Sequence, residues 1–143
     1  MIRVMLDTNI LIYATNKLSP EVIRKIASFK KKEIAISAVT WGEYRVGAEE
    51  NNFDASGFAD YLSILPFPQE AAEIYARLSR KYPQRSRAFD RLIAAHAIAL
   101  GVPLVTNNTK DFAKMQADSL QLENWAEPDG DETPQPPKQG KKA

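Results

Sequence analysis

Short apolar runs rich in β-branched residues alternate along this chain with stretches whose apolar residues recur at helical spacing. Residues 2–6, 34–37 and 102–106 are the clearest runs, and residues 89–100 are the clearest helical stretch, with Gly101 where a helix would end. Strands that alternate with helices are typical of a parallel sheet covered by helices on both faces. We therefore predict an α/β fold with a central, mostly parallel sheet.

Capping and turn residues help to place the remaining elements. Ser19 followed by Pro20 predicts the start of a helix, because serine caps helices and proline fits the first helical position. Pro66 cannot donate a backbone hydrogen bond within a sheet, so the short strand predicted at residues 64–67 is expected at an edge of the sheet. The other predicted helices are residues 9–16, 38–50, 69–81 and 110–114 and one near Tyr61, and the other predicted strands are residues 64–67 and 120–122.

A chain of 143 residues suits one domain with a hydrophobic core. Residues 1–125 are predicted to form this domain, whereas residues 126–143 are rich in proline and charge and are predicted to be a disordered tail. The apolar segment before Asp7 is too short for a signal peptide or a membrane helix. We therefore expect a cytoplasmic protein with no membrane partner.

The residue inventory excludes several kinds of chemistry. The chain has no cysteine, which excludes disulfides, thiolate zinc sites and cysteine nucleophiles. It has a single histidine, His96, which excludes ribonucleases built on a pair of histidines. Because His96 falls on an alanine-rich helix face, packing is its expected role. The acids are therefore the candidates for catalysis.

Four acids are predicted to lie near one edge of the sheet. Asp7 directly follows the first apolar run, Asp111 follows the run at 102–106 after a turn, and Glu43 lies in the helix after the run at 34–37. In open α/β sheets, ligands bind beyond the carboxyl ends of the strands, where these residues fall. Asp90 instead opens the helix of residues 89–100.

Each acid also has a purely structural explanation. Asp7, Asp90 and Asp111 could all be helix caps or first-turn acids, which the helix dipole stabilises. Glu43 is expected on the inward stripe of its helix, beside Val46, and a buried carboxylate there needs a cation. That cation could be a metal or an arginine such as Arg45 or Arg91.

Taken together, the four carboxylates favour a divalent metal ion. Carboxylates gathered in one place repel each other and need neutralisation. Mg²⁺ takes oxygen ligands of this kind, and Mn²⁺ fits the same set. Neighbouring polar side chains could orient the acids by hydrogen bonds, and the candidates are Thr8, Asn9, Ser37, Thr106 and Asn108.

A stripe of basic residues between residues 77 and 91 has Asp90 as its one acid. Such a stripe could follow a phosphate backbone, or it could be a solvated helix face. The candidates for contacts with RNA are Arg85, Arg87, Arg91 and Lys110.

Four segments together resemble a known family: residues 5–10, 37–47, 89–97 and 104–112. They are similar to the PIN-domain ribonucleases and, within these, to the VapC-type toxins of toxin–antitoxin pairs. The resemblance extends from the N-terminus to about Trp125, and it implies a single PIN-like domain.

The resemblance assigns roles to positions of this sequence. It implies that Asp7, Glu43 and Asp90 are the core metal ligands, with Thr8 and Asn9 supporting the first. Many relatives carry a fourth acid at the position of Asn108, where this sequence has an amide. We take Asp111 as the fourth acid here, with Asn108 as a neighbouring ligand or a residue that positions water. The glycine that often precedes the third acid is replaced here by residues 85–89.

The resemblance also implies an activity and partners. Mg²⁺ or Mn²⁺ would activate a water for direct hydrolysis of RNA, and the fourth carboxylate would complete its site. A VapB-type antitoxin would cover apolar helix surfaces, for which core packing is the alternative explanation, and the protein would form a homodimer. These surfaces lie around Ile10, Ile12, Tyr13, Val22, Phe58 and Tyr61.

Two other functions are compatible with parts of the pattern. One is a non-catalytic PIN-like module that binds metal or RNA without cleaving it. The other is a phosphohydrolase of the haloacid dehalogenase kind, which needs a second aspartate where this chain has Asn9. The missing aspartate counts against the phosphohydrolase, and the four acids favour the nuclease over the non-catalytic module.

Overall fold

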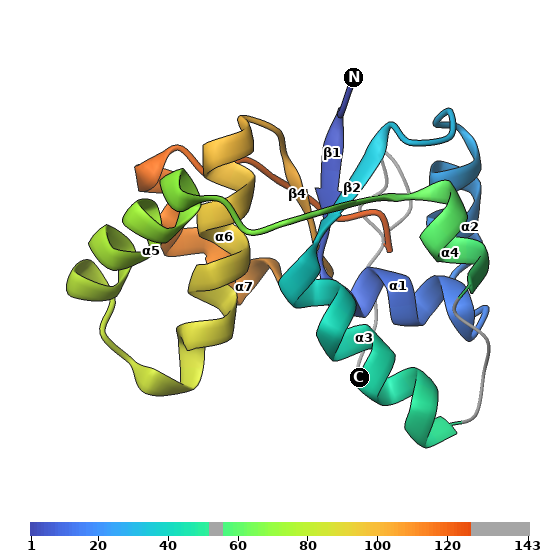
Figure 1. Ribbon diagram of the computed structural model, residues 1–143, viewed down its shortest axis with the longest axis horizontal. Helices are drawn as coiled ribbons and strands as arrows, with labels where there is room; N and C mark the ends of the chain where they lie inside the picture. The colour runs from blue at the N-terminus through green and yellow to red at the C-terminus, as the bar shows by residue number, and fades with distance from the viewer. Residues whose placement is uncertain (52–55, 127–143) are drawn as a thin grey trace.

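The computed structural model describes residues 1–51 and 56–126 (Figure 1). One sheet lies at the centre, in the order β3-β2-β1-β4-β5, and every neighbouring pair of its strands is parallel. The strands are β1 (Val4–Leu6), β2 (Ile34–Ser37), β3 (Ser63–Leu65), β4 (Leu104–Val105) and β5 (Leu122–Glu123). The predicted α/β fold with a parallel sheet is confirmed.

Helices flank the sheet on two sides, as Figure 1 shows. On one side lie α1 (Thr8–Thr15), α2 (Pro20–Ala27), α3 (Ala38–Asn51) and α4 (Ser56–Tyr61), and on the other lie α5 (Gln69–Lys81), α6 (Ala88–Leu100) and α7 (Thr109–Phe112). Two 3₁₀ turns, Arg85–Arg87 and Ala113–Asp118, precede α6 and follow α7. None of the helices in the described part of the chain is both long and apolar enough to cross a membrane.

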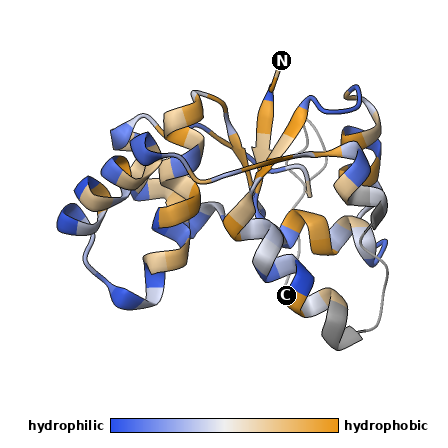
Figure 2. Ribbon diagram, in the orientation of Figure 1, coloured by the Kyte–Doolittle hydropathy of each residue, from blue (hydrophilic) through white to orange (hydrophobic). Residues whose placement is uncertain are grey.

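Strands β1 to β4 each contribute to two hydrophobic cores, because successive strand residues point to opposite faces. In β1, Val4 and Leu6 belong to the core formed with α1, α2 and α3, whereas Met5 belongs to the core formed with α5 and α6. In β2, Ile34 belongs to the first of these cores and Ala35 to the second. Figure 2 shows the central strands as strongly hydrophobic, while hydrophilic residues lie on the helices and loops around them.

Several local predictions are confirmed. The Ser19 hydroxyl accepts a hydrogen bond of 3.3 Å from the Val22 amide and caps α2, in which Pro20 is the first residue. Gly101 ends α6 with a φ of 75°, a conformation that favours glycine. Strand β3, which Pro66 follows, is at an edge of the sheet.

The strands at the ends of the chain differ from their predicted bounds. Strand β1 begins at Val4 rather than at residue 2, and β5 begins at Leu122 rather than at residue 120. Leu120 is buried in a core, but its amide bonds to the Met115 carbonyl and closes the preceding turn. Its apolar character therefore reflects burial and not strand pairing.

A packed aromatic residue lies near the last of the described residues. Trp125 is buried and stacks on Phe29, with 5.3 Å between ring centres. The tail was predicted for residues 126–143, and all of it except Ala126 lies outside the described residues, so it stays a prediction. The predicted domain end at residue 125 also stays a prediction.

Candidate active site

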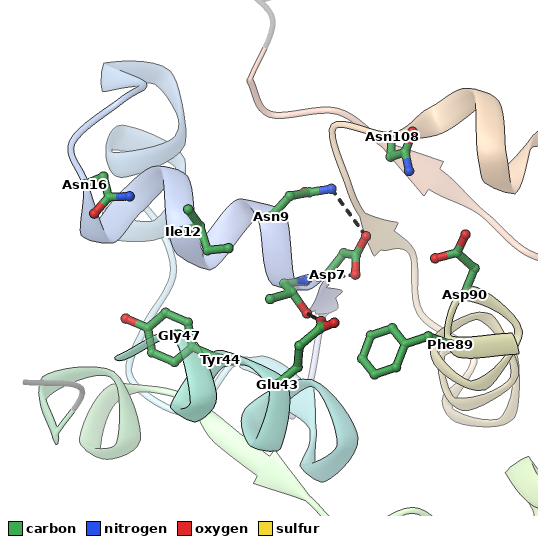
Figure 3. Close-up of a pocket in the computed structure, with 11 residues that line it drawn as sticks. Asp7, Asn9, Ile12, Asn16, Glu43, Tyr44, Gly47, Phe89, Asp90 and Asn108 are labelled. Atoms are coloured by element: carbon green, nitrogen blue, oxygen red, sulfur yellow. Dashed lines mark hydrogen bonds between the residues drawn. The ribbon is translucent and has the colours of Figure 1, made fainter. Parts of the chain in front are cut away.

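A cavity of about 750 Å³ opens beyond the carboxyl ends of the central strands. Figure 3 shows the carboxylates of Asp7, Glu43 and Asp90 turned toward this cavity from three different elements. The first lies between β1 and α1, the second on α3 and the third on α6. Three of the four predicted acids thus meet at the expected edge of the sheet.

Asp7 is the most buried of these acids, with 6% of its surface exposed. Its Oδ1 accepts a 2.8 Å hydrogen bond from the Thr8 amide, and its Oδ2 accepts one of 3.0 Å from the Thr106 hydroxyl. Burial raises the pKa of Asp7 from its ordinary 3.8 to about 6, although both hydrogen bonds lower it, and the nearby Asp90 and Glu43 raise it further. A cation placed in this cavity would stabilise the ionised form of Asp7, which burial makes unfavourable.

Asp7 caps helix α1 as well as facing the cavity. The structural explanation weighed for this residue is therefore confirmed, and its role as a metal ligand stays a prediction. One carboxylate oxygen bonds the helix amide while the other is held by Thr106. The cap fixes the orientation of the carboxylate relative to the helix.

Glu43 is held by Thr8, whose hydroxyl donates a 2.6 Å hydrogen bond to its Oε1. The prediction that Glu43 lies on the inward stripe of its helix with Val46 is wrong. Among the α3 side chains that the structure describes, Thr40, Tyr44 and Ala48 are buried, whereas Val46 is 57% exposed. Glu43 lies one position before the buried Tyr44, so it reaches the cavity at its solvent side and is not a core carboxylate that requires an arginine.

Thr106 organises the polar wall beside Asp7. It is fully buried, and its hydroxyl accepts hydrogen bonds from the Asn108 amide at 2.9 Å and from Asn9 Nδ2 at 3.3 Å. Asn9 Nδ2 also lies 3.4 Å from Asp7 Oδ2 (Figure 3). Thr8, Asn9, Thr106 and Asn108 are thus near the acids, as predicted.

Ser37 does not take part in this network, contrary to its predicted supporting role. Its hydroxyl accepts a 3.1 Å hydrogen bond from the Val39 amide at the start of α3. Ser37 is fully buried at the end of β2, and it is not among the residues that line the cavity. Its side chain is used to begin the helix that carries Glu43.

Asp111 is joined to the site through Arg87 and does not itself line the cavity. Nη1 of Arg87 lies 2.7 Å from Asp111 Oδ2 and 3.5 Å from Asp90 Oδ2. Asn108 Nδ2 also donates a hydrogen bond to Asp111 Oδ2. Burial raises the pKa of Asp90, the charge of Asp111 raises it further, and Arg87 lowers it. Asp90 and Asp111 are therefore close enough to repel each other.

The residues around the cavity fit a hard divalent cation by their chemistry. Asp7, Glu43 and Asp90 offer carboxylate oxygens, which Mg²⁺ and Mn²⁺ prefer, and no basic side chain is among the described residues that line the cavity. As the side chains stand, no three acids, histidines or cysteines in the described part are grouped closely enough to hold one ion. Coordination by all three acids therefore requires the three carboxylates to come closer together.

One predicted contact with RNA is wrong. Arg91 is only 4% exposed, and its guanidinium donates to the Ser79 hydroxyl at 3.0 Å and to the Gln84 carbonyl at 2.6 Å. These bonds attach both α5 and the loop after it to α6, so the side chain is not available to a ligand. Arg85 and Lys110 are exposed, and they stay candidates for contacts with RNA.

His96 and part of the predicted apolar surface belong to the interior. His96 is 2% exposed, and its ring packs edge-on against Phe67, with 5.3 Å between ring centres. Burial lowers its pKa. Ile10 and Val22 are fully buried, so core packing explains both, whereas Ile12 is 40% exposed. The side chain of Phe58 lies outside the described residues.

The apolar wall of the cavity was not anticipated from the sequence. Phe89, Ile12 and Tyr44 line it together with the acids (Figure 3). The position of Phe89 directly before Asp90 and the predicted apolar surface around Ile12 are the signals that could have suggested it. Such a wall suits a base or sugar beside a phosphate, because every base offers an apolar face.

Comparison with known proteins agrees with this fold and site. The family model described as PIN domain matches residues 4–118. Ribonuclease VapC2 of Rickettsia felis is 35% identical over 131 residues, which span 85% of this chain and 96% of that protein. The tRNA(fMet)-specific endonuclease VapC of Shigella flexneri is 31% identical over 135 residues, with 88% of this chain and all (100%) of that protein covered.

Solved structures give the same result. The structure of VapBC2 from Rickettsia felis, bound to a DNA fragment from their promoter, contains a chain with a TM-score of 0.72 and 34% identity, covering 87% of this chain and 99% of that one. A chain of DNA-bound VapBC from Salmonella typhimurium has a TM-score of 0.74 and 28% identity over the same shares, 87% and 99%. The chain described here belongs to the PIN-domain family and, within it, to the VapC group.

Proposed function

We propose that this protein is a metal-dependent endoribonuclease that acts as the toxin of a type II toxin–antitoxin pair. The observation that carries the proposal is the meeting of Asp7, Glu43 and Asp90 at one cavity from three separate elements. The relatives named as ribonucleases and as tRNA endonucleases support the activity. RNA as the substrate fits a cytoplasmic location.

Each residue of the site has a defined task in this proposal. Asp7, Glu43 and Asp90 would hold Mg²⁺ or Mn²⁺, which when bound would lower the pKa of a water and neutralise charge on the phosphate. Thr8 keeps one oxygen of Glu43 in place, and Thr106 does the same for Asp7. Asp111 is the fourth acid of the proposal and acts through its contact with Arg87.

Binding of RNA would use the two kinds of surface around the acids. The apolar wall at Phe89 and Ile12 can receive an unstacked base, while exposed Arg85 and Lys110 can attract the phosphate backbone. A base that must leave its stack to enter the cavity favours single-stranded or looped RNA over a duplex.

A VapB-type antitoxin is the proposed partner, since structural neighbours of this chain were solved as VapBC complexes. A groove of about 600 Å³ between α1, α2 and α4 offers an apolar surface for it, with Ile23, Ile26 and Tyr61 among its walls. A homodimer also belongs to the proposal, and sedimentation of the purified protein would measure it.

The experiment that tests the activity compares RNA cleavage by the wild type with that by Asp7→Asn, with Mg²⁺ or with EDTA. Asp60→Asn is the matched control, because Asp60 forms an exposed ion pair with Lys31. The proposal expects cleavage by the wild type and the control only with metal, and none by Asp7→Asn. Retained RNA binding without cleavage by the wild type would favour the non-catalytic module instead.

A further inference from the structure

Arg87 places a positive charge between two acids of the site. Its Nη1 lies 2.7 Å from Asp111 Oδ2 and 3.5 Å from Asp90 Oδ2. A single guanidinium nitrogen therefore bridges the first turn of α6 to the first turn of α7. The two carboxylates are mostly shielded, with 20% and 23% of their side chains exposed, so this charge is only partly screened by water.

The position of Arg87 is unfavourable for the helix that follows it. Arg87 is the residue before α6, and its side chain forms no capping hydrogen bond. A cation at a helix N-terminus opposes the helix dipole. The contacts with the two acids, and not the stability of α6, therefore explain why an arginine stands at this position.

We infer that Arg87 is a built-in counter-cation of Asp90 and Asp111, which competes with the divalent ion and sets how tightly this site binds metal. The inference rests on the proposed function, since it assumes that the acids bind a metal. Oδ2 of Asp90 cannot serve the guanidinium and a divalent ion equally well, because the two positive charges repel. Arg87 is thus a positioning residue that acts through these acids.

The surroundings of Arg87 allow it to leave. Its side chain is 45% exposed, and residues 83–87 are all exposed. Asp111 would keep the hydrogen bond from Asn108 when the guanidinium moves away. Asp90 would instead lose its ion pair with Arg87, and a metal ion would replace the guanidinium as its cation.

The test measures Mn²⁺ binding by the full-length protein without RNA, from the electron paramagnetic resonance signal of free Mn²⁺. Arg87→Ala is expected to bind Mn²⁺ about fivefold more tightly than the wild type, the effect of removing one nearby charge. Arg85→Ala is the matched control, because it removes the same charge from the same exposed turn and should bind within about twofold of the wild type. Arg87→Gln keeps a hydrogen-bond donor and should behave like Arg87→Ala.

Thermal unfolding gives a second readout that does not depend on activity. Without metal, Arg87→Ala should unfold at a lower temperature than the wild type, since Asp90 and Asp111 lose their cation. Added Mn²⁺ should then raise its unfolding temperature by more than it raises that of the wild type. If Arg87→Ala does not fold, the Mn²⁺ affinity and the unfolding temperature are measured on Arg87→Gln instead.

The possible outcomes separate this inference from the proposed function. Equal Mn²⁺ affinity in the wild type and both Arg87 variants, or weaker affinity in the variants, would overturn the inference and leave a metal-dependent site intact. Absence of Mn²⁺ binding in the wild type and in every variant would overturn both the inference and the proposed function.

Discussion

The hydroxyl of Thr8 donates a 2.6 Å hydrogen bond to Glu43, 35 residues later in the chain. This bond links the first residue of α1 to the acid on α3, and it connects Glu43 to the segment that carries Asp7. The orientation of two carboxylates therefore depends on one short segment, residues 7 and 8, which the fold places directly after β1.

Thr8→Val should reduce RNA cleavage at least about tenfold, because a hydrogen bond to a charged group is worth about 1.5–3 kcal/mol. Valine keeps the shape of threonine but cannot hold Glu43 Oε1. Thr8→Ser retains the hydroxyl and should keep most of the activity. Single-turnover cleavage rates measure the effect, and equal rates for the valine and serine variants would show that the hydroxyl does not matter.

Asp7→Asn should stabilise the metal-free protein at pH 7. The pKa of Asp7 is raised from 3.8 to about 6 in the folded state, so the folded protein binds the proton more tightly than the unfolded chain. Stability is therefore lost as pH rises through this window, and the full penalty remains at pH 7. Removing the charge should increase the free energy of unfolding by about 1–3 kcal/mol at pH 7 and by much less at pH 4.

Urea unfolding in EDTA at both pH values measures this difference. Asparagine is also a good helix cap, so α1 should begin at the same residue. Added Mg²⁺ should stabilise the wild type but not the variant, because only the wild type keeps this carboxylate. If Asp7→Asn were less stable than the wild type at pH 7 in EDTA, the expectation that the charge of Asp7 destabilises the metal-free protein would be contradicted.

Arg91→Met should destabilise the fold by about 2–3 kcal/mol, because it removes two part-buried hydrogen bonds that a charged group donates. The bonds that it removes go to the Ser79 hydroxyl and to the Gln84 carbonyl. Arg77→Ala, at an exposed position of α5, should change stability by less than about 0.5 kcal/mol. Chemical denaturation distinguishes the two variants. If Arg91→Met changed RNA affinity without loss of stability, the result would support the original prediction that Arg91 contacts RNA.

The cleaved RNA should carry no 2′,3′-cyclic phosphate. Direct hydrolysis by a water leaves the 2′-hydroxyl out of the reaction, and the only histidine, His96, is buried against Phe67 and cannot activate that hydroxyl. Mass spectrometry of the fragments identifies their ends. A cyclic phosphate, or loss of cleavage when a 2′-deoxynucleotide replaces the residue at the cut, would indicate a different mechanism.

The order of the elements and the meeting of three acids could be predicted from the sequence, because both follow from local pattern. Apolar runs alternate with helical stretches, and parallel strands bring the residues after their carboxyl ends to the same edge. That rule accounts for the placement of Asp7 and Glu43. Asp90, which opens its helix instead, was also predicted near this edge, and the family resemblance implied the same position.

The errors arose where tertiary contacts decide the outcome. The buried face of α3 is set by Thr40 and Tyr44, which a short amphipathic pattern does not distinguish from the face of Glu43. Arg91 is one of several arginines in its stretch, and only the approach of Ser79 and Gln84 shows that it is structural. The contact of Arg87 with Asp111 joins residues that no local pattern connects.

Anomalous diffraction from crystals grown with Mn²⁺ tests most directly whether the cavity acids form a metal site. The account expects an anomalous peak in the cavity that Asp7, Glu43 and Asp90 line, and loss of that peak in crystals of Asp7→Asn. An empty cavity at Mn²⁺ concentrations that support RNA cleavage, or a peak bound elsewhere on the protein, would contradict it.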